Sequence, residues 1–213
     1  MLFDLAATAP DITYKLLAAT VVPRPIAWVV THGAGGGINA APFSFFNVMG
    51  HTPPTVALGI TPDASGGLKH TARNILATRE FVVNLVPERL AGAMNLTSID
   101  APEGVDELAL AGLTGAPSAR VAPPRIAESP VALECRLMQG IETGPAQMLF
   151  IGEVLAVHIA EDCVKDATRG HIDTPKLDLI GRSYGSDYVR SHDIFRLERP
   201  RWRDYTGRKP GES

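Results

Sequence analysis

Residues that could bind an anion stand together at positions 69–74, in the segment KHTARN. It combines a lysine, a histidine and a hydroxyl with the expected start of a helix at Ala72, capped by Thr71. The first backbone N–H groups of a helix have no partner within the helix, so a helix start beside a cation attracts anions. Lys69, His70 and Thr71 are therefore candidate anion-binding residues, although Lys69 could also be a solvated charge.

Two further segments have compositions that a binding site could use. Residues 39–47, NAAPFSFFN, mix small residues, a hydroxyl, two amides and three aromatic rings. In residues 23–29, PRPIAWV, two prolines restrict the backbone around Arg24 and so fix the direction of its side chain before a strand. Simpler interpretations exist for both segments. At least one of the Phe rings should belong to the core, Trp28 is expected in the core or a subunit interface, and Arg24 could pair with an acid.

Motifs for several other chemistries are missing. The segment GAGGG at 33–37 lacks the lysine and Ser/Thr of a P-loop, and no GxGxxG or GxSxG occurs. The six histidines are scattered without an HxxxH or HExxH pair, so no metal site is expected. His171 and His192, each near an Asp, are interpreted as polar loop residues. With no catalytic side chain predicted, the chemistry is expected to belong to a bound organic cofactor.

Composition narrows the class of protein. The net charge of −3 over 213 residues gives no indication of nucleic-acid binding. The apolar stretches have the length of strands, and no signal-peptide pattern opens the chain. Cys135 and Cys163 have no metal-like spacing; a disulfide is possible by count, but two free thiols are preferred. These features predict a cytoplasmic protein that binds neither nucleic acid nor membrane.

Hydrophobic patterning predicts five or six strands with two or three short helices. Leu133, Cys135 and Leu137 alternate with Glu134 and Arg136, which suits an antiparallel sheet with one buried face. The expected strands are residues 26–31, 38–46 with an edge or bulge at Pro42, 55–60, 81–86, 131–141 and 148–159, and the expected helices are 72–79, 87–96 and about 106–110.

The chain from Cys163 onward is expected to be irregular. The strands do not alternate with long helices, so an antiparallel barrel with helices outside it fits better than a doubly wound sheet. No linker divides the chain, which predicts a single domain.

The order and spacing of these motifs resemble the flavin reductase-like FMN-binding split-barrel family. PRPIAWV, a glycine turn, NAAPFSFFN, KHTARNI and FVVN follow one another over residues 14–95, and the resemblance continues more loosely to LIGRSY at 179–184. It implies a mainly β (α+β) fold, an antiparallel Greek-key split barrel with a few short flanking helices. The domain would be residues 1–213, with irregular extensions at about 1–13 and 196–213.

The resemblance also implies which residues bind FMN. Lys69, His70 and Thr71 would hold the phosphate, although many relatives have an acid at the position of His70. The segment matching NAAPFSFFN would wrap the ring and ribityl chain. The residues implied near the flavin are Arg24, Asn39, Ala40, Ala41, Ser44, Phe45, Asn47, Arg182 and Tyr184.

The activity implied is hydride transfer from NADH or NADPH to FMN, with electrons passed to free flavin, a quinone-like compound or a partner monooxygenase. Such split barrels bind FMN between two subunits, so a homodimer is implied as well. Two alternatives stay open at the level of sequence. One is a non-catalytic FMN electron-transfer protein. The other is a split barrel that binds heme, a deazaflavin or pyridoxal phosphate, because fold alone does not determine function.

Overall fold

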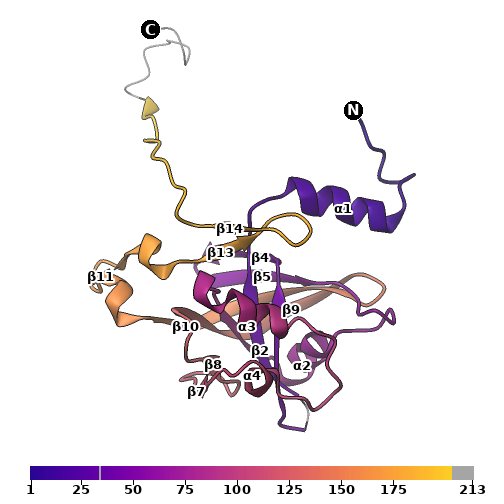
Figure 1. The fold of residues 1–213 in the computed structure, drawn as a ribbon, viewed down its shortest axis with the longest axis horizontal. Helices are drawn as coiled ribbons and strands as arrows, with labels where there is room; N and C mark the ends of the chain where they lie inside the picture. The colour runs from indigo at the N-terminus through magenta and orange to yellow at the C-terminus, as the bar shows by residue number, and fades with distance from the viewer. Residues whose placement is uncertain (34, 203–213) are drawn as a thin grey trace.

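The computed structural model describes residues 1–33 and 35–202. Its centre is a seven-stranded antiparallel sheet with the order β3-β2-β6-β9-β10-β5-β4 (Figure 1). The strands are β2 (Ala27–His32), β3 (Ile38–Phe43), β4 (Phe45–His51), β5 (Pro54–Ile60), β6 (Glu80–Asn84), β9 (Val131–Gly144) and β10 (Gln147–Ile159). All six expected strands are present. The segment expected as one strand over 38–46 is divided at Ser44 into β3 and the start of β4.

The sheet curls into a barrel because its two edge strands are neighbours in the chain. Only Ser44 separates the end of β3 from the start of β4, although these strands are first and last in the sheet. The strands β6, β9 and β10 pair in chain order, and β5, which precedes them, lies beside β10. This is a Greek-key arrangement. The mainly β fold with few short helices is confirmed, and Pro42 lies on edge strand β3 as expected.

Both faces of β2 and β6 are buried, which explains their mostly apolar sequences. Along β2, Ala27 and Val29 belong to the barrel interior, whereas Trp28 and Val30 belong to a second cluster outside it. Trp28 is fully buried and donates its indole N–H to Thr97 Oγ1 at 2.8 Å, so it is a core residue. Phe46 is the buried ring of the 43–46 segment and packs inside the barrel.

Three helices pack on the two clusters: α2 (His70–Thr78) on the barrel interior, and α3 (Ala91–Leu96), which follows the 3-10 turn η1 (Glu88–Leu90), and α4 (Glu107–Leu110) on the second cluster. A fourth helix, α1 (Pro10–Thr20), precedes the barrel in the chain (Figure 1). Asp106 caps α4 by accepting from the N–H groups of Leu108 and Ala109. Helix α2 begins at His70 with Lys69 as its N-cap, so the expected start at Ala72 with a Thr71 cap is wrong.

The N-terminal part also differs from expectation. Helix α1 begins at Pro10, within what was expected to be an irregular extension at about 1–13, and continues to Thr20. Its only buried residue is Ala18, and Figure 1 shows the helix outside the barrel. Of the expected C-terminal extension, residues 196–201 have no helix or strand, and residues 203–213 lie outside the described part.

Short strands replace irregular chain after Cys163. A three-stranded sheet joins β1 (Arg24–Pro25), β13 (Ile180–Arg182) and β14 (Tyr188–Arg190), and so returns the C-terminal part to the start of β2. The remaining short elements are β7 (Gly115–Ala116), β8 (Arg125–Ile126), η2 (Glu161–Cys163), β11 (Val164–Asp166), β12 (His171–Ile172) and η3 (Thr174–Leu177).

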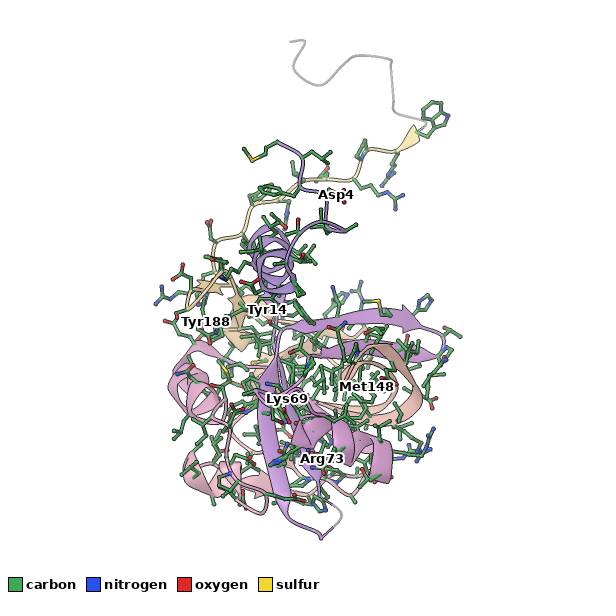
Figure 2. The ribbon with its side chains drawn as sticks, turned by 90° about the vertical axis from the view of Figure 1, so that its right-hand side faces the viewer. Asp4, Tyr14, Lys69, Arg73, Met148 and Tyr188 are labelled. Carbon is green, nitrogen blue, oxygen red and sulfur yellow. The ribbon has the colours of Figure 1, made fainter. Side chains whose placement is uncertain are left out.

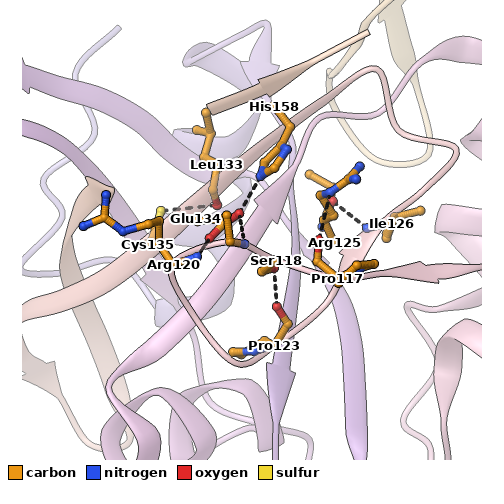
Figure 3. A network of polar contacts seen from close by, with 12 residues as sticks. Pro117, Ser118, Arg120, Pro123, Arg125, Ile126, Leu133, Glu134, Cys135 and His158 are labelled. Carbon is orange, nitrogen blue, oxygen red and sulfur yellow. Dashed lines mark hydrogen bonds and ion pairs between the residues drawn. The ribbon is translucent and has the colours of Figure 1, made fainter. Parts of the chain in front are cut away.

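One expected outward position on β9 is buried. Glu134 was expected opposite the buried face, yet its side chain is fully inaccessible. The loop before β8 covers it, and the backbone N–H groups of Ala119 and Arg120 donate to its carboxylate (Figure 3). The Nε2 atom of His158 on β10 contacts Oε1 of the same carboxylate. A buried charge is tolerated here because several hydrogen bonds satisfy it.

Cys135 and Cys163 are both free and buried, as preferred from the sequence. Burial raises the pKa of each thiol, which keeps both protonated. Among the described residues, no helix is long and apolar enough to cross a membrane.

Candidate functional site

A groove lies along β3 and the chain that leaves it. It consists of two adjoining pockets of about 350 Å³ and 610 Å³, which share Pro42, Phe43, Lys69 and Ser98 in their walls. Figure 2 shows Lys69 on this side of the molecule, below Tyr14 and Tyr188. The wall therefore combines an apolar strand surface with a cation at the junction of the two pockets.

The smaller pocket, called here the α2 pocket, contains the start of helix α2. Lys69, His70 and Thr71 all line it. The first hydrogen bond of the helix runs from the Arg73 N–H to the Lys69 carbonyl at 3.1 Å. No side chain caps the helix, so the N–H groups that precede Arg73 have no helical acceptor. Together with the Lys69 ammonium, this arrangement favours an anion.

A buried hydrogen bond links the two predicted segments in this pocket. Asn39 of β3 donates its amide N–H to Thr71 Oγ1 at 2.9 Å, and both side chains are buried. The Thr71 hydroxyl accepts in this bond and can still donate its own proton. Ala41 lines the same pocket. Residues 32 positions apart are thus fixed relative to each other.

Carboxylates also line the α2 pocket. They are Asp63, Asp100 and Glu107. Glu107 is 5% exposed, and its Oε2 accepts the Ala40 N–H at 3.0 Å. Burial raises the pKa of Glu107, although the hydrogen bond from Ala40 and the neighbouring His70 act in the opposite direction. The pKa of Asp63 is lowered because the Ser65 hydroxyl and the Gly67 N–H donate to it.

The larger pocket, called here the arginine pocket, contains Arg24 and Ser44. Arg24 is 7% exposed, and no acid among residues 1–33 and 35–202 forms an ion pair with it. Its guanidinium donates to the carbonyl oxygens of Ala18, of Val21 at 2.8 Å and of Ser183 at 2.9 Å. Its Nε also lies 3.4 Å from Ser44 Oγ. Arg24 therefore ties the end of α1 to the loop after β13, and so shapes the pocket wall.

That loop carries the C-terminal candidates. Arg182 and Tyr184 both line the arginine pocket. The Arg182 guanidinium donates to the Tyr188 hydroxyl and to the Gly185 carbonyl, and it stacks 4.7 Å from the centre of the Tyr188 ring. These contacts hold the loop in a fixed shape, with the half-exposed Tyr184 ring at the opening.

The groove brings together nine of the twelve predicted site residues. The nine are Arg24, Asn39, Ala41, Ser44, Lys69, His70, Thr71, Arg182 and Tyr184. The side chain of Ala40 is buried in the outer cluster instead. Phe45 meets Tyr14 edge-on at 6.1 Å and lines a separate pocket of about 600 Å³ under α1. Asn47 is exposed on β4, where its Oδ1 accepts the Val48 N–H.

Several groove residues were not predicted from the sequence. Tyr14 and Lys15 reach it from α1, Tyr188 from β14, and Glu107 from α4. Asp63 had a local signal, since an Asp followed by Ser and Gly is typical of a turn closed by the Asp side chain. The other four come from distant parts of the chain, and their own neighbours in sequence contain no motif.

Glu88, Asp178 and His192 form the one group of potential metal ligands among residues 1–33 and 35–202. Each already has an ionic partner. Arg190 Nη2 lies 2.6 Å from Glu88 Oε1, and His192 Nε2 lies 2.6 Å from Asp178 Oδ1. His192 is thus a polar loop residue, as interpreted from the sequence, and its side chain contacts Asp178. The group has no indication of a metal.

Comparison with protein families matches residues 19–176 to the flavin reductase like domain. An uncharacterized protein of Deinococcus radiodurans is 46% identical over 202 residues, which are 92% of this chain and 88% of that protein. The range matched by the family, residues 19–176, begins in α1 and ends in η3, so it includes the barrel and most of the groove.

Two solved structures are similar to this chain over nearly their whole length. Nitrilotriacetate monooxygenase component B from Bacillus cereus superposes with a TM-score of 0.87 at 32% identity, covering 92% of this chain and 98% of that one. The 2-nitrobenzoate 2-nitroreductase NbaA of Pseudomonas fluorescens has a TM-score of 0.86 at 31% identity, covering 97% and 100%.

Proposed function

The chain belongs to the flavin reductase-like family and has its split-barrel fold, and on that premise we propose an FMN-dependent oxidoreductase that takes a hydride from NADH or NADPH. One observation supports this most directly. The groove combines an uncapped helix start and a cation with an apolar strand wall. A phosphorylated planar cofactor requires these features together.

The residues present fit FMN at both ends of the groove. Lys69, His70 and Thr71, with the first N–H groups of α2, would hold the phosphate. Asn39 and Ala41 would lie along the ribityl chain, and Ser44 beside the ring. The Thr71 hydroxyl is oriented for this role by the Asn39 amide.

FMN, when bound, supplies the hydride chemistry at its ring. The chain's own residues would position the ring and limit access of water to it. Arg24 would hold the wall of the site in place and would not bind the flavin itself, because its guanidinium is already bonded to three carbonyl groups and the Ser44 hydroxyl. Arg182 would brace the loop that carries Tyr184, and Tyr184 would lie over the open side of the groove.

Ala40, Phe45 and Asn47 would contribute differently. Ala40 would act through its backbone, whose N–H is already bound by Glu107. Phe45 and Asn47 lie on the outer surface of edge strand β4, where a second subunit would meet them. We therefore assign them to the subunit interface next to the flavin.

A homodimer would cover apolar surface that this subunit leaves exposed. The exposed apolar residues of α1 and β4 are Ile12, Tyr14, Leu17, Phe45, Val48 and Met49. An unpaired edge strand beside such a surface is a site for association. Light scattering after size exclusion tests the dimer directly.

The electron acceptor would be free flavin, a quinone-like compound or a partner monooxygenase. The Bacillus cereus structure, named as a component of a monooxygenase, supports the partner monooxygenase among these. We infer that residues 1–213 act as one FMN-binding unit. We also infer a cytoplasmic location, which agrees with two thiols that are not joined.

The visible absorption spectrum of the purified protein tests the proposal, before and after anaerobic addition of NADH and of NADPH. A yellow protein that releases FMN and bleaches with either nucleotide would support the reductase. A yellow protein that neither nucleotide bleaches would indicate an electron carrier. A colourless protein that also fails to bind added FMN would contradict the cofactor assignment.

A further inference from the structure

A buried carboxyl group stands where the proposed function requires an anion to bind. Glu107 lines the α2 pocket together with Lys69, His70 and Thr71, which are the proposed phosphate ligands. It is 5% exposed, and within the described part of the chain the Ala40 N–H, bound to Oε2, is the one donor that another residue supplies to it. By contrast, the buried Glu134 accepts from two backbone N–H groups and contacts His158.

The charged side chains around Glu107 do not neutralise the negative charge of its carboxylate. Helix α2 presents Lys69 and His70, and α4 itself adds Asp106 at the preceding position. The segments after β5 and α3 present Asp63 and Asp100. Strand β3 presents only neutral groups to the pocket. A phosphate would therefore join a pocket lined by two carboxylates besides Glu107 and by two basic side chains, with Asp106 adjacent to Glu107 in the chain.

We propose that Glu107 couples FMN binding to proton uptake, so that its carboxyl group is protonated while the phosphate occupies the α2 pocket. This inference rests on the proposed FMN site. One proton passes from solvent to Glu107 for each FMN bound, and no other bond changes. The uptake is expected at pH values between the pKa of Glu107 in the FMN-free protein and its higher pKa in the FMN-bound protein.

The physical reason is the addition of like charge at a desolvated site. Burial already raises the pKa of Glu107. A phosphate dianion in the same pocket raises it further, because like charges disfavour the ionised carboxyl. The protonated carboxyl keeps an oxygen for the Ala40 N–H and gains an O–H that a phosphate oxygen can accept.

Calorimetric titration with FMN in buffers of different ionisation enthalpy measures the proton uptake. At about pH 8 the phosphate, whose second pKa is about 6, is a dianion both free and bound. The unaltered protein should then take up as much as about one proton per FMN. Riboflavin, which lacks the phosphate, should bind without proton uptake.

Substitutions identify the group that takes up the proton. Glu107→Gln keeps an acceptor for Ala40 and should abolish the uptake, with FMN bound about tenfold more tightly near pH 8. His70→Gln should retain the uptake. Glu103→Gln, the same change at an exposed acid outside the groove, should behave as the unaltered protein. Thermal unfolding checks that each variant is folded.

Four results would overturn the proposal. Proton uptake that survives in Glu107→Gln but disappears in His70→Gln would assign the proton to His70. Weaker binding of both FMN and riboflavin by Glu107→Gln would assign Glu107 to the ribityl chain as an ionised acceptor. FMN binding by the unaltered protein without proton uptake would reject the coupling even if no variant folds. Failure to bind FMN at all would reject the proposed function together with this inference.

Discussion

Glu134 Oε1 and His158 Nε2 lie 2.5 Å apart across β9 and β10, although the Glu134 side chain is fully buried. The same carboxylate accepts the backbone N–H groups of Ala119 at 2.8 Å and Arg120 at 2.5 Å (Figure 3). One side chain therefore joins two strands of the barrel to a loop that has little regular structure of its own. Its loss should affect stability more than any exposed acid.

Glu134→Gln should lower the free energy of unfolding by about 2 kcal/mol, because the introduced amide group faces a backbone N–H that loses its acceptor. Urea unfolding followed by circular dichroism measures the change. Glu80→Gln is the matched control, since Glu80 Oε2 accepts the Ala122 N–H of the same loop at a more exposed position. An equal loss in both variants would contradict the special role of Glu134.

Acid should destabilise the protein through the same residue. Burial alone would raise the pKa of Glu134. The hydrogen bonds from Ala119, His158 and Arg120 outweigh burial and hold this pKa below its usual value of 4.5. A lowered pKa in the folded state stabilises the protein fully above the unfolded value and progressively less as pH falls below it. Unfolding free energies between about pH 6 and pH 3 should therefore fall less steeply in Glu134→Gln. Parallel curves would refute this.

Gly152 of β10 leaves room for an aromatic ring in the barrel interior. A Cβ atom at this position would lie 2.5 Å from Phe81 Cζ, and Phe81 is fully buried. Gly152→Ala should therefore cost about 1–3 kcal/mol through overpacking. Gly92→Ala in α3, where an added Cβ would meet nothing within 4 Å, should be neutral or stabilising. Thermal unfolding should show a clearly lower melting temperature for Gly152→Ala than for the unaltered protein, and an equal or higher one for Gly92→Ala.

Much of the barrel could be predicted from the sequence because its strands are locally encoded. Residues 26–31 and 81–86 are rich in β-branched and aromatic residues, and burial on both faces makes most of their positions apolar. Helix α1 was missed because it buries only Ala18, so its sequence contains no apolar stripe facing a core. Pro10 at its first turn, followed by Asp11, was the signal available.

The candidate site was predictable where its residues are neighbours in sequence. Lys69, His70 and Thr71 reach the groove together because a helix start places them there. Glu107 reaches it only because α4 packs on β3, with a hydrogen bond between residues 67 positions apart. Contacts of this kind depend on the path of the whole chain, which no local pattern contains.

Lys69 should contribute most of the selectivity between phosphorylated and unphosphorylated flavin. It lines both pockets of the groove and stands at the N-cap of α2, where its charge adds to the unpaired N–H groups. A charge-assisted contact is worth about 1.5–3 kcal/mol, so Lys69→Ala should weaken FMN binding roughly 10–100-fold. Riboflavin affinity should stay nearly unchanged, because no phosphate is present to lose the contact. Fluorescence titration measures both affinities, with Lys165→Ala, which removes a lysine paired with Asp173 away from the groove, as the control. Equal weakening for the two flavins would place Lys69 at the ring and not at the phosphate, and no weakening for either would remove it from the site.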